Sequence, residues 1–154
     1  MTDYHLPPSL VTLEASISEW LGAFAAENPA FEAIDRGEAG EPEPRWYVRL
    51  RGEEKEHITI WITLGQRTLR YEAYVLPAPQ ENVAEVYEMA LRRNDKLVGA
   101  HFAIGVEDAL FLRGEIPLAW LTEPELDRII GSLYTYTEQA FPGLIRLAFA
   151  SKFA

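Results

Sequence analysis

Residues 45–76 read RWYVRLRGEEKEHITIWITLGQRTLRYEAYVL, and this stretch decides the fold. Three segments within it alternate apolar and polar residues: 45–51, 57–64 and 68–76. Alternation with period two, rich in β-branched and aromatic residues, is typical of antiparallel strands that bury one face. Short polar turns around Gly52 and Gly65 separate the segments. The stretch therefore predicts a three-stranded meander that ends before Pro77, because proline cannot donate to the ladder.

A helical segment precedes the meander. Apolar residues recur at helical spacing from Leu10 to Phe24, and the hydroxyl of Ser9 can accept a bond from an early amide as the N-cap. The helix is expected to end at Asn28, because the residue before a proline avoids the α region. Residues 35–44, DRGEAGEPEP, are acidic and rich in Gly, Pro and Glu, so a loop is predicted there.

Two more helices are predicted after the meander. The first runs from Asn82, with Glu85 as its capping-box partner, to Asn94. The second is long and starts after Thr122, whose hydroxyl is a good N-cap. Pro142 is expected to kink or restart this last helix, because proline removes an internal hydrogen bond.

Two extended segments lie between those helices, residues 97–104 and 109–116, and a turn at 105–108 joins them. The order of elements is therefore αβββαββα. We predict a single α+β domain over residues 1–154, in which a five-stranded antiparallel sheet carries its helices on one face.

Composition narrows the class of protein. A length of 154 residues suits one domain. The chain has no cysteine, which excludes disulfides and thiolate chemistry. No apolar run approaches the roughly 18 residues that span a bilayer, and residues 1–10 lack a signal-peptide pattern. We therefore expect a soluble, cytoplasmic protein without a membrane partner.

The net charge of −10 is unevenly placed. Residues 1–44 hold nine acidic residues and one basic residue, whereas the remainder holds fifteen and thirteen. Phosphate backbones repel such a protein unless it has a local basic stripe. The acidic part is either a solvated surface or an arm that meets a basic protein, and the sequence leaves both readings open.

The sequence shows no clear catalytic or metal-binding pattern. The histidines lie in three different segments: His5, His57 and His101. A carboxylate cluster on the second predicted helix is a candidate for acid–base work: Glu81, Glu85 and Glu88. However, Glu88 and Arg92 have the spacing of a surface ion pair, and Ser132 lies inside a predicted helix rather than on a nucleophile elbow. We expect no metal, no cofactor and no enzymatic activity.

The polar face of the meander mixes aromatic residues with arginines. Residues 45–70 carry six basic and three acidic residues. Such a mixture is enriched at protein interfaces, and it can also stack the bases of single-stranded nucleic acid. A plain solvated face can carry it too. We favour protein binding, with single-stranded nucleic acid as the alternative, and predict partner contact from five residues: Tyr47, Arg49, Trp61, Arg70 and Tyr74.

Several short motifs share one family pattern: YVLPAP at 74–79, VY at 86–87, LRRN at 91–94, GAHFAI at 99–104, PL at 117–118, LDR at 126–128, YTY at 134–136 and AF at 140–141. Through them, residues 71–150 resemble the YbjN-domain family of bacterial sensory transduction regulators. That family is similar in fold to type III secretion chaperones, which are α+β homodimers with helices on one side of a curved antiparallel sheet. The resemblance implies a binding protein and carries over no catalytic residue.

These observations predict a dimeric, chaperone-like or regulatory adaptor that binds a segment of an unidentified protein client. The other predicted partner is a second copy of the chain. The second predicted helix is expected to contribute Val86, Tyr87 and Ala90 to the dimer interface.

Overall fold

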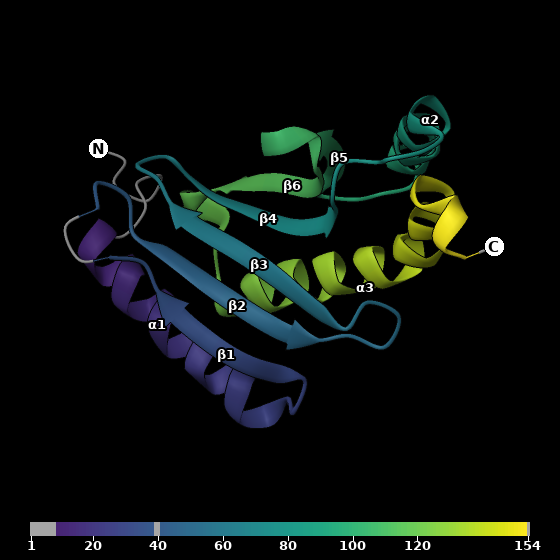
Figure 1. Cartoon of the computed structure of the whole chain (residues 1–154). Coiled ribbons are helices and arrows are strands. Elements are labelled where there is room, and N and C mark those ends of the chain that lie inside the picture. Colours follow the sequence, from purple (N-terminus) through teal and green to yellow (C-terminus); the bar gives the residue numbers. More distant parts are fainter. Residues whose placement is uncertain (1–8, 39–40, 154) are drawn as a thin grey trace.

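The computed structural model describes residues 9–38 and 41–153 (Figure 1). Within these ranges the chain forms three helices and six strands. Their bounds are α1 Leu10–Glu27, β1 Phe31–Arg36, β2 Arg45–Arg51, β3 His57–Leu64, β4 Thr68–Leu76, α2 Val83–Asn94, β5 His101–Ile104, β6 Leu110–Pro117 and α3 Glu123–Ala148.

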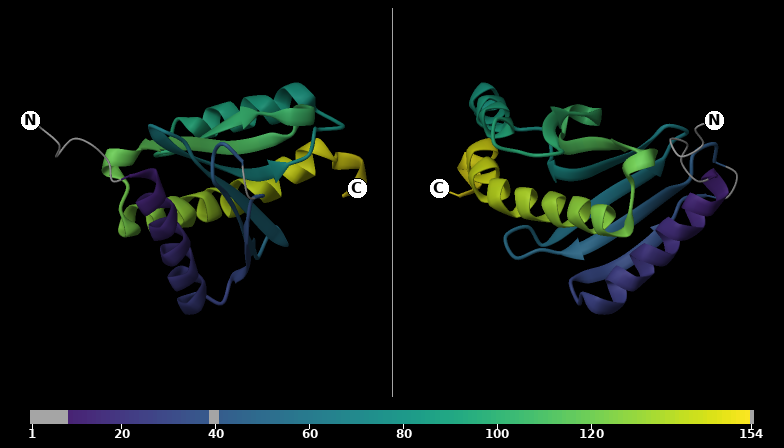
Figure 2. Two further views of the ribbon diagram at one scale, coloured as in Figure 1. Left: turned by 90° about the vertical axis from the view of Figure 1, so that its left-hand side faces the viewer. Right: turned by 180° about the vertical axis from the view of Figure 1, so that it is seen from behind.

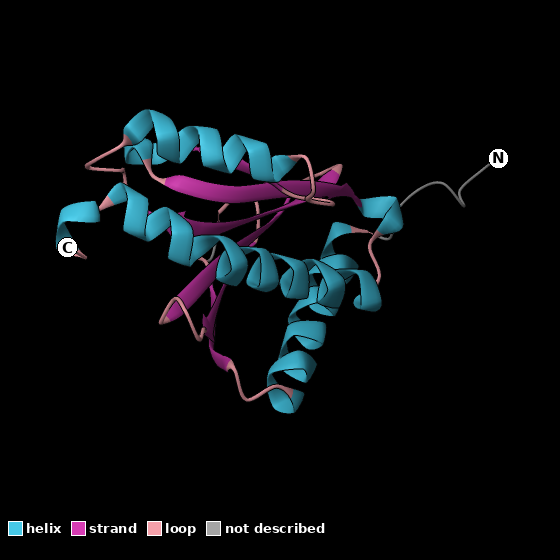
Figure 3. Cartoon of the chain, turned by 90° about the vertical axis from the view of Figure 1, so that its right-hand side faces the viewer, coloured by secondary structure: helices cyan, strands magenta, loops and turns pink. Residues whose placement is uncertain are grey.

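The strands form one antiparallel sheet in the order β1-β2-β3-β4-β6-β5. Helices α1 and α3 lie on the same side of this sheet (Figure 2), and α3 crosses the strands (Figure 3). Helix α2 packs against α3 and the edge strand β5. The opposite side of the sheet, here called the outer face, looks toward the reader in Figure 1.

The α+β class is confirmed, but the prediction of five strands is wrong, because β1 is a sixth strand. It pairs with β2, with Ile34 opposite Val48. A register shift between Phe31 and Ala33 interrupts its alternation, which hid the strand from a reading based on period two. As a consequence, the loop predicted at 35–44 begins only after Arg36.

The three meander strands have the bounds that the sequence predicted, and β5 is shorter than expected. The segment before β5 turns instead of extending, since Gly99 has a φ of +77°. Asn94 then binds the edge of β5 through its side chain. Its Oδ1 accepts from the amide of Phe102 at 2.6 Å, and its Nδ2 donates to the carbonyl of Phe102 at 3.4 Å.

Two of the predicted helix caps are confirmed. Ser9 Oγ accepts from the Thr12 amide, and Thr122 Oγ1 accepts from the Glu125 amide, both at 3.2 Å. Asn82 forms no side-chain cap. Its Nδ2 instead donates to the carbonyl of Leu147 at 2.9 Å, which ties the start of α2 to the end of α3. Helix α3 continues through Pro142 to Ala148.

The core lies between the sheet and the helices. Alternate residues of β2, β3 and β4 are buried there against Leu13, Ile17 and Leu21 of α1 and the apolar stripe of α3. Trp46 belongs to this core, and its Nε1 donates to Ser18 Oγ of α1 at 3.0 Å. Because each large apolar side chain buried in this way contributes about 1.5–3 kcal/mol, the inner face holds the fold together. The outer face is left to carry other chemistry.

Candidate functional site

The outer face carries all five side chains that the sequence assigned to partner contact. Tyr47 and Arg49 come from β2, whose intervening residues are buried. Trp61 comes from β3, and Arg70 and Tyr74 come from β4. The antiparallel register places Trp61 directly opposite Tyr47, so period two alone was enough to assign these residues to one face.

Four rings form an aromatic cluster on this face: Tyr47, Trp61, Tyr74 and Phe111. Tyr47 meets Trp61 edge-on at 6.4 Å between ring centroids, and Tyr74 meets Phe111 edge-on at 5.4 Å. Trp61 and Phe111 are 6.3 Å apart. Such pairs contribute about 0.5–1.5 kcal/mol beyond the area they bury, so the cluster holds its own shape.

The sequence reading missed Phe111 of β6. Its neighbours Leu110 and Leu112 are also apolar, and this run of three concealed the alternation along β6. Period two counted from Ala109 would have placed Phe111 on the same face as Arg113. The guanidinium of Arg113 lies 4.9 Å from the centroid of the Phe111 ring.

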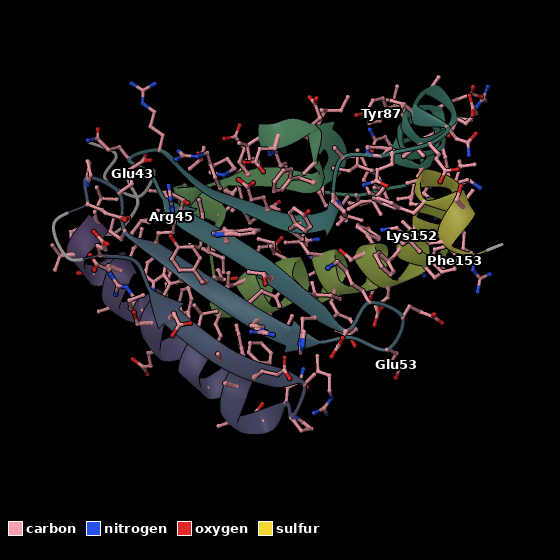
Figure 4. All side chains as sticks on the ribbon, viewed as in Figure 1. Glu43, Arg45, Glu53, Tyr87, Lys152 and Phe153 are labelled. Carbon is pink, nitrogen blue, oxygen red and sulfur yellow. The ribbon has the colours of Figure 1, made fainter. Side chains whose placement is uncertain are left out.

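A groove of about 880 Å³ lies over the aromatic cluster. Trp61, Tyr74 and Phe111 line it together with Pro77, which follows β4, and with residues from two distant parts of the chain: Val106, Phe149 and Lys152. A second hollow of about 390 Å³ adjoins it and is lined by Arg70, His101 and Arg113. The two hollows share Arg45, Trp61, Thr63 and Glu72, so we treat them as one feature, the outer groove. Figure 4 labels Arg45 and Lys152 toward opposite ends of the molecule.

Two of the predicted contact residues already bind carboxylates of the chain itself. Arg49 Nε lies 3.6 Å from Glu32, and Arg70 binds Glu43 with its closest contact at 2.6 Å. The hydrogen bond between Arg70 and Glu43 lowers the pKa of Glu43 and raises the pKa of Arg70. Exposed pairs of this kind contribute only about 0–1 kcal/mol. Another carboxylate can therefore compete for either arginine.

Arg45 and Lys152 differ from these arginines. Within residues 9–38 and 41–153, neither has a carboxylate oxygen within 4.0 Å. Arg45 Nε donates to Thr63 Oγ1 at 3.3 Å, and Lys152 Nζ lies 5.4 Å from the ring centroid of Phe149. Both cations therefore line the groove while their charges remain available.

The β2–β3 turn is held against α3 by one carboxylate. Glu138 accepts hydrogen bonds from the amides of Glu53, Glu54 and Lys55, the last two at 3.0 and 3.1 Å. Lys55 Nζ lies 5.6 Å from the ring centroids of both Tyr74 and Phe141, and burial lowers its pKa. The turn thus supports Tyr74 from the side.

The residues predicted for a dimer interface do not share one surface. Val86 and Ala90 are 0% and 2% exposed and belong to the core of the chain itself. Tyr87 is only partly buried and packs against the edge of the same core. Val86 and Ala90 therefore lie on the side of α2 that packs within the chain, where α2 contacts α3 and β5.

The described residues hold no group of three or more potential metal ligands. His57 binds Glu32, His101 lines the outer groove, and His5 lies outside the described residues. The predicted carboxylate cluster does not lie on one helix, because Glu81 precedes α2. Glu81 accepts from Ser151, and Glu88 of α2 binds Arg92 at 2.7 Å. In the described ranges, no helix combines the length and the apolar character needed to span a bilayer.

Residues 17–146 match the YbjN family model, whose description reads "putative bacterial sensory transduction regulator". Uncharacterized proteins of Mycobacterium tuberculosis and Mycobacterium bovis are 32% identical over 70% of this chain. One from Mycobacterium leprae is 30% identical over 70% of the chain. The match covers 58–59% of these relatives, so the chain spans about three-fifths of their length. Because the family match includes the whole sheet and most of α1 and α3, this chain belongs to the YbjN family.

Proposed function

We propose that this protein is a non-enzymatic, chaperone-like or regulatory adaptor that binds a segment of a partner protein in the outer groove. The description of its family as a regulator supports this proposal. The observation that carries it is an aromatic cluster on a sheet face that α1 and α3 leave uncovered. Partly exposed Trp and Tyr side chains are typical of binding hot spots. A cysteine-free chain suits our further proposal that it works in the cytoplasm.

Single-stranded nucleic acid fits the same face less well. Carboxylates stand among the arginines, with Glu72 lining the groove and Glu43 already bound to Arg70. A strand that lays successive phosphates along the sheet would meet these carboxylates, and the net charge of −10 adds to the repulsion. A polypeptide can instead place apolar side chains on the rings and leave the carboxylates solvated.

The double variant Trp61→Ala with Tyr74→Ala is expected to lose the partner, because it removes two of the four rings. The measurement is affinity capture from the native cytosol with mass spectrometry, in which one protein should bind the wild-type chain and be absent with the variant. Trp120→Ala is the control, because Trp120 is 70% exposed but lies outside the outer groove.

Circular dichroism shows whether the double variant folds. If it does not, Trp61→Phe with Tyr74→Phe keeps the apolar volume and should retain most of the binding. A partner that the folded double variant captures as well as the wild-type chain does would contradict the proposed function.

We also propose that the adaptor is a homodimer whose two copies meet through the exposed flank of α2. This flank presents Val83, Tyr87 and Leu91 at helical i, i+4 spacing. Glu85 lies in the first turn of α2, and Arg92 and Arg93 lie in its last turn. If two copies of α2 meet antiparallel across a two-fold axis, the acidic end of each helix lies against the basic end of the other.

Leu91→Glu is expected to convert the dimer into a monomer, because it places a charge in the apolar stripe of both copies. Size-exclusion chromatography with light scattering at micromolar concentration measures the mass. Val11→Glu is the matched control on α1, since Val11 is exposed and lies far along the chain from α2. A wild-type chain that runs as a monomer would refute the dimer.

A further inference from the structure

We propose that the outer groove selects acidic segments. Its occupant would be an extended stretch of a partner protein that combines an apolar or aromatic anchor with at least one nearby carboxylate. This inference rests on the proposed function and adds the chemistry of the partner. Three features of the groove support it: its apolar part, its available cations, and a carboxylate of the chain that already binds at its rim.

The apolar part accepts the anchor. Trp61, Tyr74 and Phe111 come together there, and Pro77 and Val106 line the same hollow. Phe111 is 4% exposed and its ring contacts those of Trp61 and Tyr74, so the floor is preformed. Val106 is largely exposed at the rim, where an incoming side chain would cover it. Because aromatic rings bury a large area at small entropic cost, this part supplies affinity without selecting charge.

Four cations line the outer groove, Arg45, Arg70, Arg113 and Lys152, against three carboxylates, Glu72, Glu107 and Glu115, and this excess of positive charge supplies the selection. Arg45 lines both hollows and has no carboxylate oxygen of the described residues within 4.0 Å. The Nε of Arg113 lies 3.6 Å from a Glu72 oxygen, a long ion pair like that between Arg49 and Glu32, and this buried nitrogen has no hydrogen-bond partner among the described residues. Lys152 lies at the other end of the groove. A carboxylate that approaches Arg45 would gain charge-assisted hydrogen bonds, whereas a lysine there would be repelled.

The chain provides its own example of such a carboxylate. Glu43 lies between Pro42 and Pro44, two positions before Arg45, and binds Arg70 at 2.6 and 3.3 Å. Arg70 also lines the second hollow of the groove. An acidic, proline-containing segment of the chain therefore already forms an ion pair with Arg70 at the rim of the groove. Because Glu43 is tethered, it competes with any external carboxylate for Arg70 at high effective concentration.

A selection from a phage-displayed library of random dodecamers, on the wild-type chain, tests the inference. We expect the enriched sequences to combine an aromatic or apolar residue with carboxylates. One enriched peptide, labelled with fluorescein, then gives a dissociation constant by fluorescence anisotropy. Arg45→Gln should weaken its binding about tenfold, which is the equivalent of about 1.4 kcal/mol. Arg146→Gln, on the exposed side of α3, should leave the binding unchanged.

Glu43→Gln gives a second readout with the opposite sign. It removes the internal competitor and frees Arg70, so the same peptide should bind about two- to fivefold more tightly, in line with the small energy of an exposed ion pair. A general loss of folding cannot produce tighter binding. Weaker or unchanged binding would refute the competition by Glu43.

The outcomes separate this inference from the proposed function. Suppose that the enriched peptides depend on Trp61 for binding and yet carry no excess of carboxylates and bind Arg45→Gln as tightly as the wild-type chain. That result would refute the selection of acidic segments but would leave the proposed binding groove intact. Enrichment of basic peptides would refute it too. If no peptide binds in a way that depends on Trp61, both the inference and the proposed function fail.

Discussion

Replacement of Gly114 by alanine is expected to lower the free energy of unfolding by about 1–3 kcal/mol, the range of overpacking in a well-packed core. A Cβ at this position would lie 2.3 Å from the carbonyl oxygen of Gly99 and 2.6 Å from a ring carbon of Tyr71. Neither neighbour can move freely, because the hydroxyl of Tyr71 donates to that same carbonyl at 2.7 Å. The methyl group would therefore push β6 away from β4.

Urea unfolding measures this loss as a lower midpoint at an unchanged slope. Gly131→Ala is the matched control, because Gly131 lies in α3 and the added methyl would have no atom within 4 Å beyond the adjoining residues and backbone of its own helix. It should raise the free energy of unfolding by about 0.5–1 kcal/mol, as alanine favours the helix. Equal midpoints for Gly114→Ala and the wild-type chain would contradict the account of this contact.

Glu138→Ala is expected to lower the free energy of unfolding by about 2–3 kcal/mol. The substitution removes the charged acceptor that three successive amides of the β2–β3 turn share. Gly52 makes this approach possible, since a Cβ there would lie 2.0 Å from the carbonyl oxygen of Lys55 and 2.8 Å from the Glu138 carboxylate. Tyr134 adds a hydrogen bond to the carbonyl of Arg51 at 3.1 Å. Without Glu138, the turn would keep this hydrogen bond and the weaker contact of Lys55 with the Phe141 ring of α3.

Amide hydrogen exchange at Glu53, Glu54 and Lys55 reports the loss directly, and all three should exchange faster in Glu138→Ala. Glu138→Gln keeps one acceptor oxygen without the charge and should fall between the variant and the wild-type chain. Gln139→Ala, at the exposed neighbouring position, is the control for a change in helix propensity. Unchanged protection in Glu138→Ala would show that the amides have other partners.

Much of the fold was readable from local patterns. The bounds of β2, β3 and β4 and the caps at Ser9 and Thr122 followed from period two and from the chemistry of single residues. The strand β1 did not follow, because its bulge breaks the alternation. The end of the second helix was also readable. The sequence did not reveal that the side chain of Asn94 binds the edge of β5.

The candidate site divides in the same way. Alternation placed Tyr47, Trp61 and Tyr74 on one face, and the structure brings two of these rings against Phe111, which the sequence reading had not selected. The arginine content of this face was also readable. Arg70 is already bound to Glu43, whereas Arg45 forms no ion pair with a described carboxylate, and this difference depended on how a loop returns to the sheet.

Strand faces and helix ends follow from residues that are neighbours in the chain, so the amino-acid order alone was sufficient for them. The order of strands, the burial of Val86 and Ala90 under α3, and the groove depend on contacts between distant residues. Glu138 and the turn it binds are 83–85 positions apart, and Asn82 reaches a carbonyl 65 positions away. Such contacts form only when the whole core packs, because many segments compete for the same apolar surface and only their joint burial selects one arrangement.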